Sequence, residues 1–338
     1  MTKRERVIAA LQHKQTDFIP HSIGFTQVAK EKMAKFYKDD NFIEKIGNHI
    51  TSFYYPGGDR PVPSKDGYFK DDFGVIWNRT VDKDIGVIDG FQIVKPDISS
   101  YQFPPVPEAF IRRHCEETLD GAGDCFTFAS LGFSLFERAW TLTGMENLLI
   151  FMITDPDFVT ELFDKITEFN MRLIDIFLDY DFDGVHFGDD WGQQQGLIMG
   201  PELWRKFIKP QLAKMYGAVK EKGRFVSQHS CGDINEVLPD LIEVGLDVYQ
   251  TFQPEIYDVE AVKSLYGDKL SFWGGISTQR LLPFATPEKL LEESVRIMKL
   301  AGKSGGFIAA PTHDLPGDVP AENIDTLIRL FNNQSKYM

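Results

Sequence analysis

The chain has 338 residues, of which 43% are hydrophobic and 25% charged, so it can bury a full core. Its net charge is −14 without a block rich in Lys or Arg, which argues against binding to nucleic acid or to an anionic membrane surface. No apolar run reaches the roughly 18 residues of a membrane span, and no signal peptide is recognisable. The three cysteines, Cys115, Cys125 and Cys231, are a sparse, odd set that indicates a reducing, cytoplasmic location.

Short apolar runs alternate with longer helical patterns along the chain. The predicted strands are DFIPHSIG (17–24), a weaker HITSFYY (49–55), FTFASLG (126–132), DGVHFGDD (183–190), FVSQHSCG (225–232), DVYQTFQP (247–254), LSFWGGIS (270–277) and GGFIAAPTH (305–313). Apolar residues recur at spacings of three and four in the intervening segments, which are 155–180, 200–223, 234–245, 258–267 and 286–302. Within 200–223, Pro210 is expected to kink or divide the helix.

This alternation of strands and helices predicts parallel strands joined by right-handed crossovers. Eight runs favour an α/β fold of the closed (β/α)8 TIM barrel type over an open doubly wound sheet, and no GxGxxG motif opens a helix. We expect a single domain over residues 1–338. The segment at about 56–125 is too long for one connection, and we interpret it as an elaboration over the barrel mouth, with a hairpin within 67–80.

Polar side chains stand where the predicted strands end. The active site of such a barrel lies at the carboxyl ends of its strands, so these side chains are expected to converge in space. They are Ser130, Asp189, Asp190, His229, Cys231, Gln253, Ser277 and His313.

His229 and Cys231 are two residues apart at the end of one strand, so both side chains point to the same side. An imidazole and a thiolate are half of a catalytic Zn²⁺ site, which needs three protein ligands and one open position. The third ligand would come from another strand end, with His313 as the first candidate and Asp190 as the second. The alternative is a hydrogen-bonded histidine near a turn beside a small buried thiol.

The sequence FGDDWG (187–192) allows two interpretations. Asp189 and Asp190 either cap the next helix from a solvated turn, or one of them orients a ligand histidine or carries a proton. Trp191, next to them, is expected in the core or in the wall of a pocket.

Several stretches together resemble the uroporphyrinogen decarboxylase superfamily over nearly the whole chain. They are TKRERVIAALQHKQTDFIP, DDFGVIW, FERAWTLTGMENLL, DGVHFGDDWG, GPELWRKFIKP, HSCGD, LPDLIEVGLDVYQTFQPE, FWGGIS and GGFIAAPTHDLPGDVPAENI. The resemblance implies a (β/α)8 barrel, which agrees with the strand count, and barrels of this type often pair as homodimers.

The resemblance implies one of two activities. The decarboxylases use no metal and grip the carboxylates of their substrate with an MRQAGR-type motif, where this chain reads IPHSIGFTQVAKEKM and offers only Lys30 and Lys32. The other members are zinc-dependent methyltransferases that work with a cobalt corrinoid on a partner protein, and HSCGD resembles their HxCG element. Their third zinc ligand is a cysteine near the C-terminus, where this chain has His313 in APTHD.

The leading hypothesis is therefore a zinc-dependent methyltransferase that moves a methyl group between a small methylated compound or thiol and a corrinoid protein. Zn²⁺ would be bound by His229, Cys231 and His313, with Asp190 or Asp189 as the catalytic carboxylate. Two alternatives are a metal-free decarboxylase of a smaller acid and a non-catalytic protein that binds a corrinoid protein. The substrate pocket is expected to include Gln253, Ser277, Ser130 and the apolar side chains Trp191 and Phe252.

Overall fold

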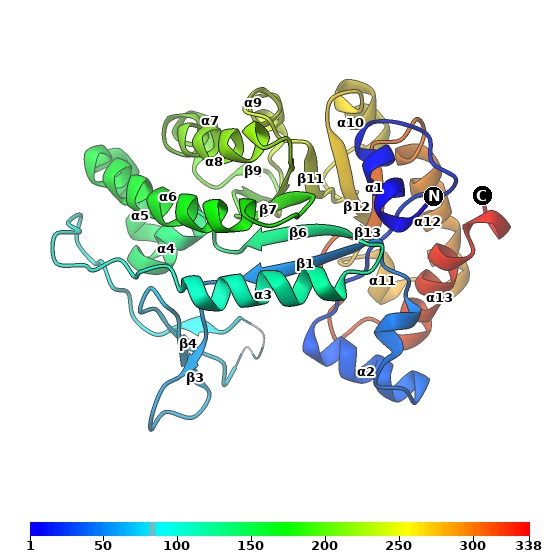
Figure 1. Cartoon of the computed structure of the whole chain (residues 1–338), viewed down its shortest axis with the longest axis horizontal. Coiled ribbons are helices and arrows are strands. Elements are labelled where there is room, and N and C mark those ends of the chain that lie inside the picture. The colour runs from blue at the N-terminus through cyan, green and yellow to red at the C-terminus, as the bar shows by residue number, and fades with distance from the viewer. Residues whose placement is uncertain (82, 84) are drawn as a thin grey trace. The chain divides into compact units, whose positions relative to one another are not determined.

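The computed structural model describes residues 1–81, 83 and 85–338 (Figure 1). The chain forms two compact units. The first consists of Met1–Thr51, Ala122–Thr127 and Asp247–Met338, and the second of Ser52–Gly121 and Phe128–Leu246. Each unit combines parallel strands with helices, so the α/β class predicted from the sequence is confirmed.

The second unit contains strands β7 (Gly184–Gly188) and β10 (Phe225–His229), together with most of β1 (Ile50–Tyr55) and β6 (Phe126–Leu131). Their order is β1-β6-β7-β10, and β7 pairs in parallel with both β6 and β10. The register places Ser130 opposite His186, and Gly188 opposite His229. Because the strands are parallel and in step, the chain leaves β7 and β10 at the same edge of the sheet.

Helices of the second unit follow the predicted apolar periodicity. The longest is α6 (Pro156–Leu178), which begins with Pro at its first position and buries a continuous apolar stripe. Pro210 divides the predicted helix 200–223, because α8 begins at Lys209 directly after a π-helical turn over Trp204–Ile208. The others are α3 (Glu108–Gly121), α4 (Phe136–Thr143), α5 (Met145–Thr154), α7 (Gly200–Leu203), α8 (Lys209–Glu221), the 3-10 turn Asn235–Val237 and α9 (Leu238–Glu243).

The segment before α3 forms a small antiparallel sheet, β2 to β5 in order along the chain. The predicted hairpin within 67–80 is confirmed, since Tyr68 pairs with Asn78. Asp71, between β3 and β4, forms a buried ion pair of 2.6 Å with Arg138 of α4. That pair ties the small sheet to the helical part of the second unit. The strands are β2 (Arg60–Pro61), β3 (Tyr68–Lys70), β4 (Ile76–Asn78) and β5 (Val87–Ile88).

The first unit has three consecutive parallel strands, β11 (Val248–Thr251), β12 (Ser271–Ile276) and β13 (Phe307–Pro311). Its helices are α1 (Lys3–Leu11), α2 (Gln27–Tyr37), the turn Phe42–Lys45, α10 (Val259–Tyr266), α11 (Leu281–Phe284), α12 (Pro287–Ala301), α13 (Ala321–Asn332) and the turn Gln334–Lys336. Thr286 caps α12 by accepting the backbone N–H of Lys289, followed by Pro287 at the first helical position.

The predicted strand at 17–24 is not a regular strand. It makes one parallel bridge, between His21 and Ala309 of β13. The neighbouring backbone N–H groups of Ile19 and Ile23 donate instead to the side chains of Gln334 and Asn48. Pro20 has no N–H group, so a continuous ladder is interrupted there as well. The other seven predicted runs each contain a strand.

No helix in the described ranges of the chain is long and apolar enough to cross a membrane.

Candidate metal centre

Two loops at the carboxyl ends of neighbouring strands pack together in the second unit. Two backbone hydrogen bonds join the β7 loop (189–193) to the β10 loop (230–233), and a third joins the β7 loop to His229, the last residue of β10. The N–H of Asp189 donates to the carbonyl of His229 at 3.1 Å, and the N–H of Gly192 donates to the carbonyl of Cys231 at 3.2 Å. The remaining hydrogen bond runs from the N–H of Asp233 to the carbonyl of Gln193 at 2.7 Å. The backbone on both sides of Cys231 is therefore fixed.

The two loops approach so closely that glycine is required where they meet. Gly232 has φ +79°, and a Cβ built on it would lie 2.2 Å from the carbonyl carbon of Gly192. A Cβ on Gly192 would lie 2.6 Å from the carbonyl carbon of Gly232. The glycine after Cys231 in HSCGD is thus explained by both its backbone angle and this contact.

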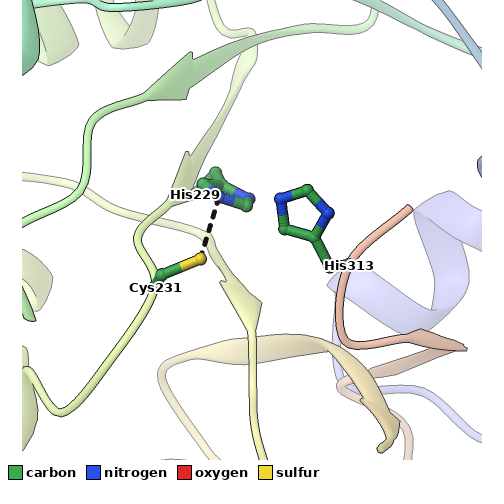
Figure 2. A group of neighbouring side chains, drawn as sticks. All are labelled: His229, Cys231 and His313. Carbon is green, nitrogen blue, oxygen red and sulfur yellow. Dashed lines mark hydrogen bonds between the residues drawn. The ribbon is translucent and has the colours of Figure 1, made fainter. Parts of the chain in front are cut away.

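The predicted ligand pair is assembled at this place. Cys231 Sγ lies 3.6 Å from His229 Nε2, and Figure 2 marks this interaction with a dashed line. At the usual Zn–S and Zn–N bond lengths and a tetrahedral angle, two ligand atoms lie roughly 3.5 Å apart. The pair therefore fits a shared zinc ion without rearrangement of the backbone.

Asp190 is the acidic residue next to the pair. Its Oδ1 accepts the backbone N–H of Cys231 at 2.8 Å and lies 3.4 Å from His229 Nε2. Burial alone would raise the pKa of Asp190, but the hydrogen bond and charge of His229 outweigh it and lower that pKa to about 2. Burial would likewise lower the pKa of His229, but its interactions with Asp190 and Cys231 raise it well above the usual value. Without metal, the two residues therefore favour the charged pair.

Asp189 points away from this pair, into the protein. Its buried carboxylate accepts the backbone N–H groups of Leu135, Phe136 and Glu137 at 3.3, 2.9 and 2.7 Å, which are the free donors at the start of α4. It also accepts the indole N–H of Trp191 at 2.5 Å. Burial raises the pKa of Asp189 to about 6, against the opposing effect of these hydrogen bonds. Asp189 therefore caps the N-terminus of α4, although it lies far from that helix in the sequence.

Sequence reasoning missed Glu137, in the first turn of α4. Its pKa is raised well above the usual value by burial and by the charges of Asp190 and Asp189, while His229 acts in the opposite direction. Glu137 is therefore a third carboxyl group in the same cluster. Glu137 lies in the connection after the carboxyl end of β6, where site residues of such a fold are expected. Nothing in the sequence FERAW, however, distinguishes it from a surface glutamate.

Two other predicted residues of the second unit are buried. Ser130 lies in β6, and 3% of its surface is exposed. Trp191 is completely buried and packs edge-to-face on Trp204 at 5.4 Å between ring centroids. Because its indole N–H donates to Asp189, Trp191 stabilises the conformation of the β7 loop.

The remaining predicted residues belong to the first unit. Phe252 is buried with φ +46° and packs on Phe272. Gln253 is buried. Ser277 Oγ interacts with Glu255 and accepts the backbone N–H groups of Arg280 and Leu281 at 2.9 and 3.2 Å. Its hydroxyl therefore begins the turn that leads into α11.

His313 also belongs to the first unit, where it follows β13 and is exposed. By residue type, His229, Cys231 and His313 form a group that could hold a metal ion, and Figure 2 labels the three side chains.

Comparison with known proteins gave one family and several structures. The family model of uroporphyrinogen decarboxylase (URO-D) matches residues 92–334. A methyltransferase from Methanosarcina mazei has a TM-score of 0.73 at 18% identity, with 99% of both chains covered. A B12-independent methionine synthase from Shewanella sp. W3-18-1 has a TM-score of 0.49 at 10% identity, covering 97% of this chain and 99% of that one. No curated protein sequence matches. At 18% identity, the likeness to the Methanosarcina mazei protein shows a shared fold.

Proposed function

Because the chain belongs to the uroporphyrinogen decarboxylase family, we propose that it is a zinc-dependent methyltransferase. It moves a methyl group between a small methylated compound or thiol and the corrinoid (cobalamin) of a partner protein. The observation that carries the proposal is the 3.6 Å separation of Cys231 Sγ and His229 Nε2, which suits two ligands of one tetrahedral zinc ion. The fold shared with a protein described as a methyltransferase supports it.

In this proposal Zn²⁺ is held by His229, Cys231 and His313, and a fourth position takes the substrate. When bound there, zinc lowers the pKa of a substrate thiol or withdraws electrons from an ether oxygen. Histidine in place of a second cysteine, as the third ligand, leaves one thiolate in the ligand set. A site with two imidazoles carries less negative charge, so it is a stronger Lewis acid than a site with two thiolates.

The residues around the ligands have separate roles. Asp190 holds the backbone of Cys231 and faces His229, so we assign it as the carboxylate that orients the ligands or moves a proton. Asp189 fixes the start of α4 and thereby positions Glu137. Gln253, Ser277 and Ser130 are the candidates for polar contacts to substrate, and Trp191 and Phe252 support the surrounding loops.

The surroundings of α2 argue against the decarboxylation of a substrate with many carboxylates. Of the two lysines in the segment that replaces the arginine motif, Lys32 donates to the carbonyl oxygens of Gly317 and Val319. Its ammonium group is thus used within the protein, and only Lys30 of this pair is available to a polyanionic substrate. A metal-free decarboxylase acting on a smaller acid remains the second candidate because of the family itself.

The test is metal analysis of purified protein together with methyl transfer to cob(I)alamin. We expect about one zinc per chain, and at least tenfold lower zinc content in His229→Ala and Cys231→Ser. Cys125→Ser is the matched control, since it removes another partly exposed thiol. His313→Ala tests the third ligand separately.

Two results would contradict the proposal. One is full methyl transfer by metal-free protein, and the other is unchanged zinc content in both ligand variants. Release of CO₂ from a small acid, insensitive to chelators and to Cys231→Ser, would establish the decarboxylase instead.

A further inference from the structure

A cavity of about 750 Å³ opens in the first unit, formed by residues outside the candidate metal centre. Its volume is within the range of sites for small organic ligands. The cavity is lined by buried side chains from four separate segments, so it is built by the tertiary fold. These side chains are Ile19, His21, His49, Met298 and Phe331.

The charged groups at this cavity are mainly basic, although the whole chain has a net charge of −14. Arg6 is paired with Asp17 through two hydrogen bonds of 2.6 and 2.7 Å. Lys299 and Lys303 are exposed and form no ion pair with any residue that the structure describes. Lys3, Lys299 and Lys303 therefore outnumber the remaining acid, Asp124.

Two imidazoles line the cavity, and burial is the main cause of their lowered pKa values. The pKa of His49 is lowered to about 4, first by burial and then by the charges of Arg6 and Lys3. Burial also lowers the pKa of His21 to about 3. Both are neutral at pH 7, so they add aromatic surface rather than charge. His21 packs on Phe331 with 5.0 Å between the ring centroids, which makes part of the lining continuous and aromatic.

We propose that this cavity is a second binding site, for a small organic anion with an aromatic or branched apolar body. The apolar lining would take the body, and Lys299 and Lys303 would face the carboxylate or phosphate group. A free inorganic anion would leave the lining unused, and a neutral aromatic would leave the lysines unused. The site is independent of the metal centre and of the proposed methyl transfer.

The experiment is titration calorimetry with phenyl phosphate and benzoate, compared with inorganic phosphate and benzyl alcohol. We expect saturable binding of one aromatic anion per chain, with a Kd in the millimolar range or below. Inorganic phosphate and benzyl alcohol are each expected to bind at least fivefold more weakly. Whichever of phenyl phosphate and benzoate binds more tightly identifies the preferred anionic group.

Two variants and a matched control test the location. Lys299→Gln/Lys303→Gln removes the facing charges and is expected to raise the Kd about fivefold or more. Lys30→Gln/Lys35→Gln makes the same charge change on α2, at two exposed lysines away from the cavity, and is expected to leave it unchanged. Ser335→Trp places a large side chain at an exposed position in the cavity lining and is expected to abolish binding.

Equal affinity of the two double variants would overturn the proposal. So would the absence of saturable binding to wild-type protein at about 10 mM, a concentration at which a Kd of about 1 mM is readily detected. Because the readout is binding and not turnover, failure here is distinguishable from failure of the proposed methyl transfer.

Discussion

Asp189 and Asp190 are neighbours in the chain with the same side chain and different roles. Asp189 is completely buried and accepts four hydrogen bonds, three of them from the first turn of α4. Asp190 is only partly buried and faces His229 and the backbone of Cys231. Consecutive residues at a strand end point in opposite directions, so one carboxylate serves the fold and the other the site.

Exchanging each aspartate in turn should separate these roles. Asp189→Ala leaves buried N–H groups without a partner and should lower the free energy of unfolding by about 2 kcal/mol or more. Asp190→Asn should cost less than about 1 kcal/mol but weaken zinc binding about tenfold. Urea unfolding and competitive zinc titration of both variants check this. A larger loss of stability in Asp190→Asn than in Asp189→Ala would reverse the assignment.

The ligand pair lies at the end of β10 and in the loop that follows it, against the β7 loop. Cys231 lies outside any helix or strand, yet the backbones of the two loops are joined by hydrogen bonds and meet at Gly192 and Gly232. This backbone contact fixes the Cα positions of His229 and Cys231, so the orientation of the ligands depends on the absence of side chains at two glycines.

Gly232→Ala should therefore damage the metal centre. The added Cβ forces the loops apart, and we expect about tenfold or more weaker zinc binding along with lower thermal stability. Gly223→Ala is the matched control, because Gly223 has φ +68° but open space around a built Cβ. It should cost about 1 kcal/mol of stability and leave zinc affinity unchanged. Similar zinc affinities of the two variants would show that the loop contact is not needed.

On the scale of the whole molecule, the folded chain keeps several histidines neutral in its interior. His21 and His49 are each 2% exposed, and the pKa of each is lowered, to about 3 and about 4. Both pKa values lie below the usual 6.5 of histidine. The unfolded chain therefore binds more protons than the folded chain between these values, and stability must fall as the pH falls through this range.

Acidification from pH 7 to pH 5 should destabilise the chain by about 2 kcal/mol for each of these two histidines. His21→Gln keeps a donor for the carbonyl of Ile46, which His21 Nε2 contacts at 3.2 Å, but cannot titrate. Its loss of stability between the two pH values should be smaller than that of wild type by about 2 kcal/mol. Urea unfolding at both pH values measures this difference, in which the contributions of carboxylates cancel. Identical pH dependence of the two proteins would contradict it.

The sequence by itself determined the strand runs, the position at which Pro210 divides a helix, and the HxC pair on one strand end. These features are local, because periodicity records which face of a segment is buried, and an i, i+2 spacing sets the direction of two side chains. The family resemblance followed from the same stretches and was confirmed by the match to residues 92–334.

Only the tertiary structure decided which polar groups become partners. The carboxylate of Asp189 caps a helix that begins 53 residues earlier, at Phe136, and Glu137 joins the cluster through that contact. The segment 17–24 is not a regular strand, because the backbone N–H groups of Ile19 and Ile23 donate to the side chains of Gln334 and Asn48. Gln334 lies 315 residues from Ile19 in the chain. Such partners are set by packing between distant elements, and no local pattern of residues records them.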